Sequence, residues 1–434
     1  MKKTMAGTIW TYNYSIAAII AGFVMLAILL AASILIRPAT GPDVLSHFSS
    51  GFLIKAADYN RSVMLISIAE RFISWAAMLA IVALFWKNAH ANMRIAIYWA
   101  ILIFIAFNII LYIIMLPLQY WQGFVLGHRF GLSNQSLAAW FIDVLKDRAI
   151  SLIINSGIMT LLYVLIIKLP KTWWIAAAAV LILFFILASF IYPVVIDPLF
   201  YKFTPLKDEV LQKEINDMTD KAGIKIDKIL VADASRKTNT VNAYFTGIGG
   251  TKRIVIYDNL LNNHSRGEVL SVIAHEIGHW RNRHILYNTI IGCAEIILLV
   301  LILKMVQTGL QFNAPIQSGQ IGSIGQAGSV LPTGFGQPIN FGVKLVAILF
   351  ILYSFLSYIS MPLDNLISRQ FERQADRASV AITGDPATQV KIFENLAIAN
   401  LSNVKPGKLL EYIIFSHPPI IDRINASLKP GSKK

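Results

Sequence analysis

The stretch "IAIYWAILIFIAFNIILYIIMLPL" (95–118) has no charged side chain along its whole length. A helix of about 20 largely apolar residues is long enough to span a bilayer. Six further stretches are largely apolar, and they lie at 14–36, 62–86, 149–167, 173–196, 285–304 and 341–361. The seven stretches together predict a predominantly α-helical, polytopic membrane protein.

The composition of the chain agrees with a membrane protein. Of its 434 residues, 56% are hydrophobic and 14% are charged, whereas soluble domains have about 25% charged residues. The mean hydropathy is +0.60. The formal charge of +14 comes from lysines and arginines spread over the polar segments between the apolar stretches. We attribute this charge to membrane topology and expect no nucleic-acid partner.

Two local features argue against a cleaved signal peptide and against a cysteine-based cluster. The first apolar stretch follows Met1-Lys2-Lys3, but it is too long for the core of a signal peptide and lacks a small-residue cleavage site, so we expect a retained anchor. The lone cysteine, Cys293, excludes an intrachain disulfide and a cysteine-based metal cluster. Any metal centre therefore depends on histidines and carboxylates.

The apolar stretches divide the chain into four parts. We expect a membrane domain with five spans (1–196), a polar part (197–284), a hairpin of two spans (285–362) and a second polar part (363–434). The hairpin puts both polar parts on the same side of the membrane. Its connecting loop, 305–340, is rich in Gly and Gln and has no charge, and loops without positive charge tend to be exported. The polar parts are therefore expected in the cytoplasm.

A helix is predicted over "SRGEVLSVIAHEIGHWRNRH" (265–284). Ser265, followed three residues later by Glu268, is typical of a capping box, and the apolar residues after it recur at helical spacing. A glycine inside a helix costs about 1 kcal/mol relative to alanine. Gly278 therefore indicates that another group approaches the helix closely at this point.

Two histidines share one face of this predicted helix. His275 and His279 are four residues apart, so their imidazoles can bind a single zinc ion. Glu276 would lie beside the ion, where a carboxylate can take a proton from water and pass it to the leaving amine. His284 falls off this face at the membrane edge, and we expect an interfacial position for it. The alternative is a solvated helix with two histidines by chance, but the H-E-x-x-H pattern favours zinc.

A catalytic zinc normally has three protein ligands, so one more is needed. No third histidine follows at the short H-x-x-G-x-x-H spacing, and a glutamate from another helix is the next candidate. Residues 364–382 have helical spacing and put Glu372 and Asp376 on one face. Glu372 can bind the ion, while Asp376 and Arg369 support the ligands from behind. The alternative is that these residues, together with Arg373, form only surface ion pairs.

Seven segments, spread over most of the chain, carry a resemblance to a known family. They are "LPLQYWQGFVLGHRFGLSNQS" (116–136), "YPVVIDPLFYKFTPL" (192–206), "DASRKTNTVNAYFTG" (233–247), "KRIVIYDNLL" (252–261), "HEIGH" (275–279), "SRQFERQAD" (368–376) and "SHPPIIDRI" (416–424). In their residues and in their order along the chain, these segments resemble motifs of the zinc-dependent type I CAAX prenyl proteases, which are integral-membrane metallopeptidases. The resemblance implies about seven transmembrane helices around a chamber, with a small α+β zincin-like catalytic domain.

The resemblance also implies the parts of the metal centre. His275, His279 and Glu372 match the family's three zinc ligands, which implies one Zn²⁺ per chain, and Glu276 matches its general base. The two polar parts of the chain would then form one catalytic domain, because the third ligand comes from the second part.

Two more residues match positions that contact substrate in the family. Asn242 matches a residue that holds the substrate backbone, and His417 matches a histidine near the scissile carbonyl. Without the resemblance, Asn242 would be read as a turn residue and His417 as a loop residue before two prolines. Segments 227–233 and 252–258 are rich in Ile and Val and predict short strands. A strand at a metal cleft could bind a peptide as an added strand.

The sequence therefore predicts an integral-membrane zinc metalloendopeptidase. Its expected partners are the lipid bilayer and a peptide, either a prenylated C-terminal peptide or another membrane-associated one. The Lys-Lys amino terminus, the lack of long tails and the "GHRFGLSNQS" wording (127–136) lead us to expect a bacterial inner-membrane protein. The alternatives are a quality-control protease of membrane proteins with the same chemistry, and a non-catalytic membrane chamber or transporter.

Overall fold

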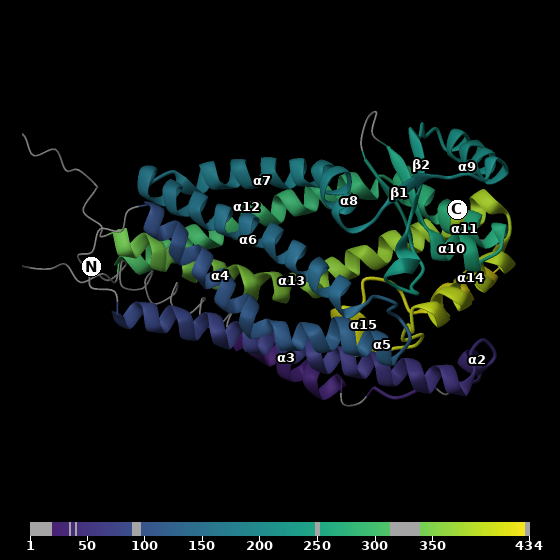
Figure 1. Cartoon of the computed structure of the whole chain (residues 1–434), viewed down its shortest axis with the longest axis horizontal. Helices are drawn as coiled ribbons and strands as arrows, with labels where there is room; N and C mark the ends of the chain where they lie inside the picture. Colours follow the sequence, from purple (N-terminus) through teal and green to yellow (C-terminus); the bar gives the residue numbers. More distant parts are fainter. Residues whose placement is uncertain are drawn as a thin grey trace, which may run out of the picture.

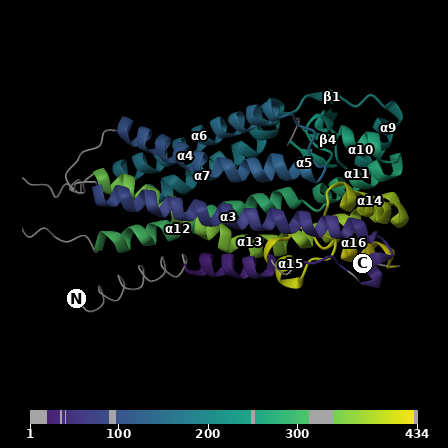
Figure 2. The same ribbon diagram turned by 60° about the horizontal axis from the view of Figure 1, so that its bottom comes forward.

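The computed structural model describes residues 20–33, 36–39, 41–88, 97–247, 252–312 and 339–429. Its helices form a long bundle, and a lobe with a small sheet lies at one end of that bundle (Figure 1). The same division is visible after rotation (Figure 2). The predicted architecture, a helical membrane bundle with a small α+β lobe, is confirmed.

Six helices in the described ranges are long and apolar enough to cross a membrane. They are α3 (Ser50–Asn88), α4 (Ile97–Gln119), α6 (Leu137–Lys168), α7 (Trp173–Ile191), α12 (His284–Phe312) and α13 (Ile339–Thr383). Each contains most of one predicted stretch. Of the first predicted stretch, Ile20–Ser33 forms a shorter apolar helix, and residues 14–19 lie outside the part that the structure describes. Most of loop 305–340 lies outside it as well.

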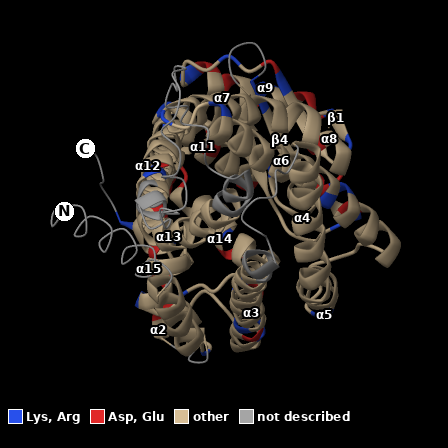
Figure 3. Cartoon of the chain, turned by 90° about the vertical axis from the view of Figure 1, so that its left-hand side faces the viewer, with Lys and Arg blue, Asp and Glu red and all other residues tan. Residues whose placement is uncertain are grey.

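The outer surface of the bundle is apolar, as expected of helices that face lipid. Ile113 on α4, Leu183 on α7 and Leu298 on α12 are all more than half exposed. Seen from the end away from the lobe, most of the helical ribbon is uncharged (Figure 3). Water would penalise so large an apolar surface, whereas a bilayer covers it.

Shorter helices connect the bundle to the lobe and build the lobe itself. The α-helices are α2 (Pro42–Leu45), α5 (Gly127–Arg129), α8 (Asp197–Phe200), α9 (Glu209–Lys221), α10 (Asp258–Asn263), α11 (Arg266–Arg281), α14 (Pro386–Ala399), α15 (Lys408–Ile414) and α16 (Ile420–Leu428). Two π-helical turns, Tyr120–Leu126 and Tyr192–Ile196, extend α4 and α7, and a 3₁₀ turn covers Ala234–Arg236.

The lobe contains a four-stranded sheet in the order β1-β2-β4-β3. Its strands are β1 (Phe203–Pro205), β2 (Lys228–Ala232), β3 (Ala243–Thr246) and β4 (Arg253–Tyr257). β2 and β4, the two strands predicted from sequence, pair in parallel, and β3 pairs antiparallel to β4 at the edge. Ile254 and Ile256 of β4 share one buried core with Ile273 and Ile277 of α11. The sheet therefore supports the helix that carries both candidate histidines.

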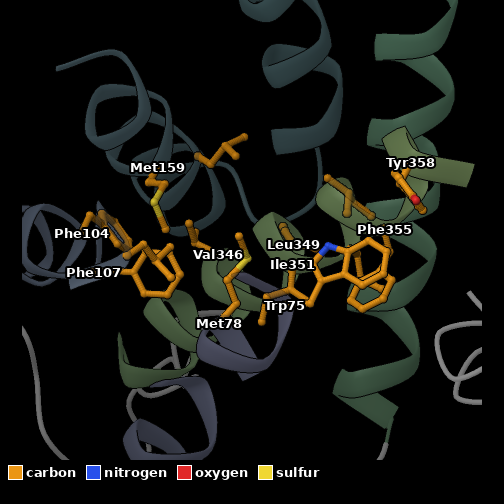
Figure 4. Packing of buried hydrophobic residues seen from close by; sticks show 14 of the residues in the cluster. Trp75, Met78, Phe104, Phe107, Met159, Val346, Leu349, Ile351, Phe355 and Tyr358 are labelled. Atoms are coloured by element: carbon orange, nitrogen blue, oxygen red, sulfur yellow. The ribbon is translucent and has the colours of Figure 1, made fainter. Parts of the chain in front are cut away.

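Aromatic packing joins α3 to α13 inside the bundle. The Trp75 ring stacks on Phe355 with ring centroids 3.9 Å apart, and its Nε1 donates a hydrogen bond to Ser354 Oγ at 2.9 Å. Figure 4 shows this stack beside Leu349 and Ile351 of α13. Buried aromatic pairs of this kind fix the position of one helix against another.

α13 is one continuous helix of 45 residues that contains Pro362. The sequence instead predicts a span at 341–361 and a separate helix at 364–382, with a part boundary between 362 and 363. The helix does not end at Pro362, because proline inside a membrane helix is tolerated where its surroundings satisfy the freed backbone groups, while the division of the chain into parts stays a prediction. A single helix therefore extends from the membrane bundle into the lobe.

α11 and α13 make a close contact at Gly278, so the predicted close approach there is confirmed. A Cβ built on Gly278 would lie 2.9 Å from the Cβ of Ala378 and 3.0 Å from the Cα and carbonyl oxygen of Ala375. Two of these three atoms belong to the α13 backbone and cannot move aside. A methyl group at position 278 would therefore push the two helices apart.

Gly278→Ala is expected to destabilise the protein by about 1–3 kcal/mol, the usual cost of overpacking a tight contact. The measurement is thermal unfolding of the purified protein in detergent. Gly267→Ala on the same helix is the matched control, because its Cβ would lie 3.4 Å from Thr388 Cγ2, an ordinary contact. Equal unfolding temperatures for the two variants would contradict the role of this contact.

Candidate metal centre

α11 begins with the predicted capping box. The Ser265 side chain accepts a hydrogen bond from the Glu268 backbone N–H, and the Glu268 carboxylate accepts one from the Ser265 backbone N–H at 2.8 Å. The Asn395 side chain of α14 donates a further hydrogen bond to Glu268. The reciprocal hydrogen bonds fix the residue at which α11 begins, and the contact with Asn395 joins its first turn to α14.

The structure brings together His275, His279 and Glu372. The two Nε2 atoms are 3.1 Å apart, and each lies 3.3 Å from an oxygen of the Glu372 carboxylate. The three ligand atoms lie within 4.8 Å of one another. Glu372 Oε2 is buried and has no hydrogen-bond donor. Two imidazole nitrogens and a carboxylate oxygen that accepts no hydrogen bond are ligands that fit zinc.

Asp376 lies behind His275, as the sequence analysis expects. Its Oδ1 is 2.9 Å from His275 Nδ1. Arg423 of α16 donates two hydrogen bonds to the Asp376 carboxylate, at 2.8 and 2.6 Å, and its Nη2 lies 3.6 Å from Glu372 Oε2. Burial disfavours the charged form of His275, but the contacts to Asp376 and Glu372 outweigh burial and raise its pKa to about 10.

Arg423 is the functional candidate that sequence reasoning missed. It is contained in the quoted segment "SHPPIIDRI", but no spacing rule relates it to Asp376, 47 residues earlier. Chemistry gives a partial expectation, because a carboxylate beside a histidine needs a positive partner and Arg can bind it through two hydrogen bonds, but no spacing in the sequence selects Arg423.

Arg369, the other residue expected to support the ligands, lies on α13 three residues before Glu372, and its role at the metal centre stays a prediction. Its guanidinium is buried and donates hydrogen bonds to the carbonyl oxygens of Glu411, at 2.7 Å, and Phe415, at 2.5 Å. These carbonyls belong to the end of α15, where backbone acceptors lack helical partners and a cation is favourable. Arg369 holds the segment that leads to His417. The alternative of surface pairing is wrong, because Arg369, Glu372 and Asp376 are all buried.

His417 and Glu276 both border the three candidate ligands. His417 Nε2 lies 3.3 Å from Glu372 Oε1, and its side chain is 58% exposed. Glu276 is half-buried and lines the same cavity as His275 and His417. Burial raises the pKa of the Glu276 carboxyl, the direction that suits a group that must accept a proton near neutral pH.

A cavity of about 710 Å³ connects these residues to the interior of the bundle. Its wall includes Asn242, Glu276 and His417, together with Met64 and Tyr358 from the membrane helices. Asn242 is exposed, and its backbone carbonyl accepts a hydrogen bond from Tyr257 at 3.0 Å. The candidate metal centre therefore opens into a space that is lined by both polar and apolar groups.

The expectation that His284 lies off the face of His275 and His279 is corrected, whereas its position at the start of a candidate membrane span agrees with the expected membrane edge. Its side chain is buried, and its Nδ1 lies 3.0 Å from His279 Nδ1. The sequence prediction assumed one helix over 265–284. In the structure α11 ends at Arg281, Arg283 has a φ of 57°, and α12 begins at His284. The left-handed residue changes the direction of the chain and returns His284 to the face of His279.

Comparisons with known proteins agree with this arrangement. The model of "Peptidase family M48" matches residues 205–430, and the model of "CAAX prenyl protease N-terminal, five membrane helices" matches residues 35–202. The chain is 32% identical to an uncharacterized metalloprotease of Bacillus subtilis over 74% of the chain and 71% of that protein. It is also 32% identical to CAAX prenyl protease 1 of Saccharomyces cerevisiae, over 74% of the chain and 70% of that protein.

A solved structure is similar over nearly the whole chain. The crystal structure of S. mikatae Ste24p superimposes with a TM-score of 0.76 at 26% sequence identity, and covers 96% of this chain and 99% of that one. The similarity therefore includes both the membrane bundle and the lobe with the candidate metal centre.

Proposed function

The chain belongs to peptidase family M48 and is a membrane zinc metalloprotease that resembles CAAX prenyl protease 1, and on that premise we propose how its own residues carry out peptide hydrolysis. His275, His279 and Glu372 would hold one zinc ion per chain. The observation that carries this proposal is the convergence of their ligand atoms within 4.8 Å, with Glu372 Oε2 buried and lacking a donor. When bound, zinc supplies a Lewis acid that makes water nucleophilic at neutral pH.

The remaining groups would move protons and stabilise charge. Glu276 takes the proton from the attacking water and delivers it to the leaving amine. His417, whose Nε2 faces the same carboxylate as the two histidines, donates a hydrogen bond to the oxygen that becomes negative during attack. Asp376 and Arg423 keep the His275 ring oriented, and Arg369 keeps the His417 segment against α13.

The substrate would bind as an extended peptide along β3. Within the described residues β3 is an edge strand that pairs only with β4, and Asn242 and Ala243 at its start line the same cavity as Glu276, so the strand borders the proposed site. Main-chain hydrogen bonds to an edge strand give affinity with little demand on sequence. Asn242 would hold the substrate backbone at the start of β3, because an amide can pair with both peptide groups.

The apolar part of the cavity wall favours a membrane-associated peptide. Met64 and Tyr358 bring apolar surface from α3 and α13 to the same cavity as the proposed catalytic groups. We propose that the substrate is a C-terminal peptide that carries a lipid, and that the lobe lies in the cytoplasm of a bacterial inner membrane. The four-part division at 196, 284 and 362 is kept as a proposal, except that α13 is continuous across 362.

The purified protein is expected to cleave a lipidated peptide at least tenfold faster, in kcat/KM, than the same peptide without its lipid. Each buried CH₂ group contributes about 0.8 kcal/mol to binding in an apolar environment. The measurement is cleavage in detergent or nanodiscs by mass spectrometry. A zinc chelator should abolish cleavage, and added zinc should restore it.

Equal cleavage of both peptides would favour the quality-control alternative, which uses the same residues on unlipidated membrane proteins. No cleavage of either peptide by zinc-loaded protein would contradict the proposed function. In that case the wild-type zinc content remains an independent measurement of the metal centre.

A further inference from the structure

Three side chains, the buried His284 and the half-buried Phe371 and Gln374, form a continuous contact behind His279. His279 Nδ1 lies 3.0 Å from His284 Nδ1, and His284 Nε2 lies 2.9 Å from the side-chain oxygen of Gln374. The His284 residue is only 1% exposed. The Phe371 ring stacks on the His284 ring, with centroids 4.2 Å apart and planes within 12°. α13 therefore contributes both the stacking surface and the amide that face His284.

The positions of the hydrogens follow from the side of His279 that faces the other ligands. Its Nε2 is the atom near His275 and Glu372, so Nε2 must present a lone pair to a metal ion. A neutral imidazole carries its single proton on the other nitrogen. His279 Nδ1 is then a donor, and His284 Nδ1 is its acceptor.

The same reasoning extends to Gln374. Because His284 accepts at Nδ1, its proton lies on Nε2, which is 2.9 Å from the Gln374 oxygen. An amide oxygen only accepts hydrogen bonds, so Gln374 selects this tautomer of His284. All hydrogens along the contact then point in one direction, from His279 through His284 to Gln374.

We propose that His284 is a positioning residue that holds the ring of His279, in the tautomer able to bind metal, through this directed chain to Gln374. The inference rests on the proposed function in one respect, namely that His279 is a ligand. The two histidines are then supported differently. His275 faces the charged Asp376–Arg423 pair, whereas His279 faces a neutral imidazole and a neutral amide.

His284→Phe is expected to weaken zinc binding by about 10–100-fold, the usual effect of removing a hydrogen-bond partner from a metal-binding histidine. A phenyl ring keeps the stacking on Phe371 but cannot accept the hydrogen bond. The measurement is competition for zinc between the purified full-length protein and a chromogenic chelator. Cobalt substitution gives a second readout, because the absorption bands of Co²⁺ report the geometry of its ligands.

Phe371→Leu is the matched control. It removes the ring that stacks on His284 and leaves both hydrogen bonds in place, so zinc affinity should stay within threefold of wild type. A His284→Phe protein that folds and binds zinc within twofold of wild type would overturn the inference. If His284→Phe does not fold, Gln374→Met is the deciding variant. It is expected to lower zinc affinity about fivefold, because the buried N–H of His284 is left without an acceptor. An unchanged zinc affinity would overturn the inference.

These outcomes are separate from those of the proposed function. Wild-type protein that binds no zinc, or a His279→Ala variant that binds it as well as wild type, would remove the premise itself. Stoichiometric zinc in wild type, its loss in His279→Ala and an unchanged His284→Phe would leave the metal centre standing and overturn only the role of His284.

Discussion

Glu276→Gln is expected to lower peptide cleavage by about 10²–10⁴-fold, the contribution of a positioned general base. Glutamine has nearly the same shape as glutamate but cannot take the proton from water. Glu276 is half-buried in the wall of the cavity, and burial raises the pKa of its carboxyl, which suits this group to accept a proton. The measurement is kcat for a membrane peptide at saturating substrate.

Zinc content separates a loss of the base from a loss of the metal. Glu276 is not among the three groups whose ligand atoms converge, so Glu276→Gln should retain one zinc ion per chain. Glu209→Gln, on the exposed first turn of α9, is the control and should leave both quantities unchanged. Cleavage by Glu276→Gln above one tenth of the wild-type rate would refute the assignment of the base.

Glu372→Gln is expected to weaken zinc binding by more than about 100-fold, beyond the 10–100-fold typical of residues that only support ligands. The carboxylate is the single negative group among the three converging ligands, and it is buried between His275, His279 and His417. An amide in its place keeps the shape but removes the charge that attracts a divalent cation. The measurement is zinc affinity by chelator competition, followed by cleavage.

Glu394→Gln is the matched control for this variant. Glu394 also contacts a histidine, with its Oε1 2.6 Å from His47 Nδ1, but this pair lies between α2 and α14 and not at the metal centre. Zinc affinity should therefore be unchanged. Stoichiometric zinc of wild-type affinity in Glu372→Gln would exclude Glu372 as the third ligand.

The membrane architecture could be predicted from sequence because apolar length is a local property. All six described spans contain a stretch that was marked by hydrophobicity alone. The strands β2 and β4 were predictable for the same reason, because a short run of Ile and Val favours a strand whatever the rest of the chain does. The continuity of α13 was not, because Pro362 is a local signal for a break that the packed helix overrides.

The residues of the candidate metal centre that lie on one helix could be predicted from their spacing in the sequence. His275, Glu276 and His279 follow from a spacing of four, and the capping box fixes where their helix begins. Arg423, Arg369 and His284 depend instead on contacts between segments that are remote in sequence or that follow a left-handed turn. Such contacts arise from tertiary packing, and one sequence alone carries no rule for them.

The placement of ligands on α11 and α13 also sets the order in which the centre matures during synthesis. Glu372 leaves the ribosome 93 residues after His279, which at about 5–20 residues per second is roughly 5–20 s later. Between them lie α12 and the membrane part of α13, both of which must enter the bilayer first. The nascent chain therefore carries only two of its three proposed ligands until α13 is completed, and the proposed oxyanion donor, His417, follows Glu372 by 45 further residues.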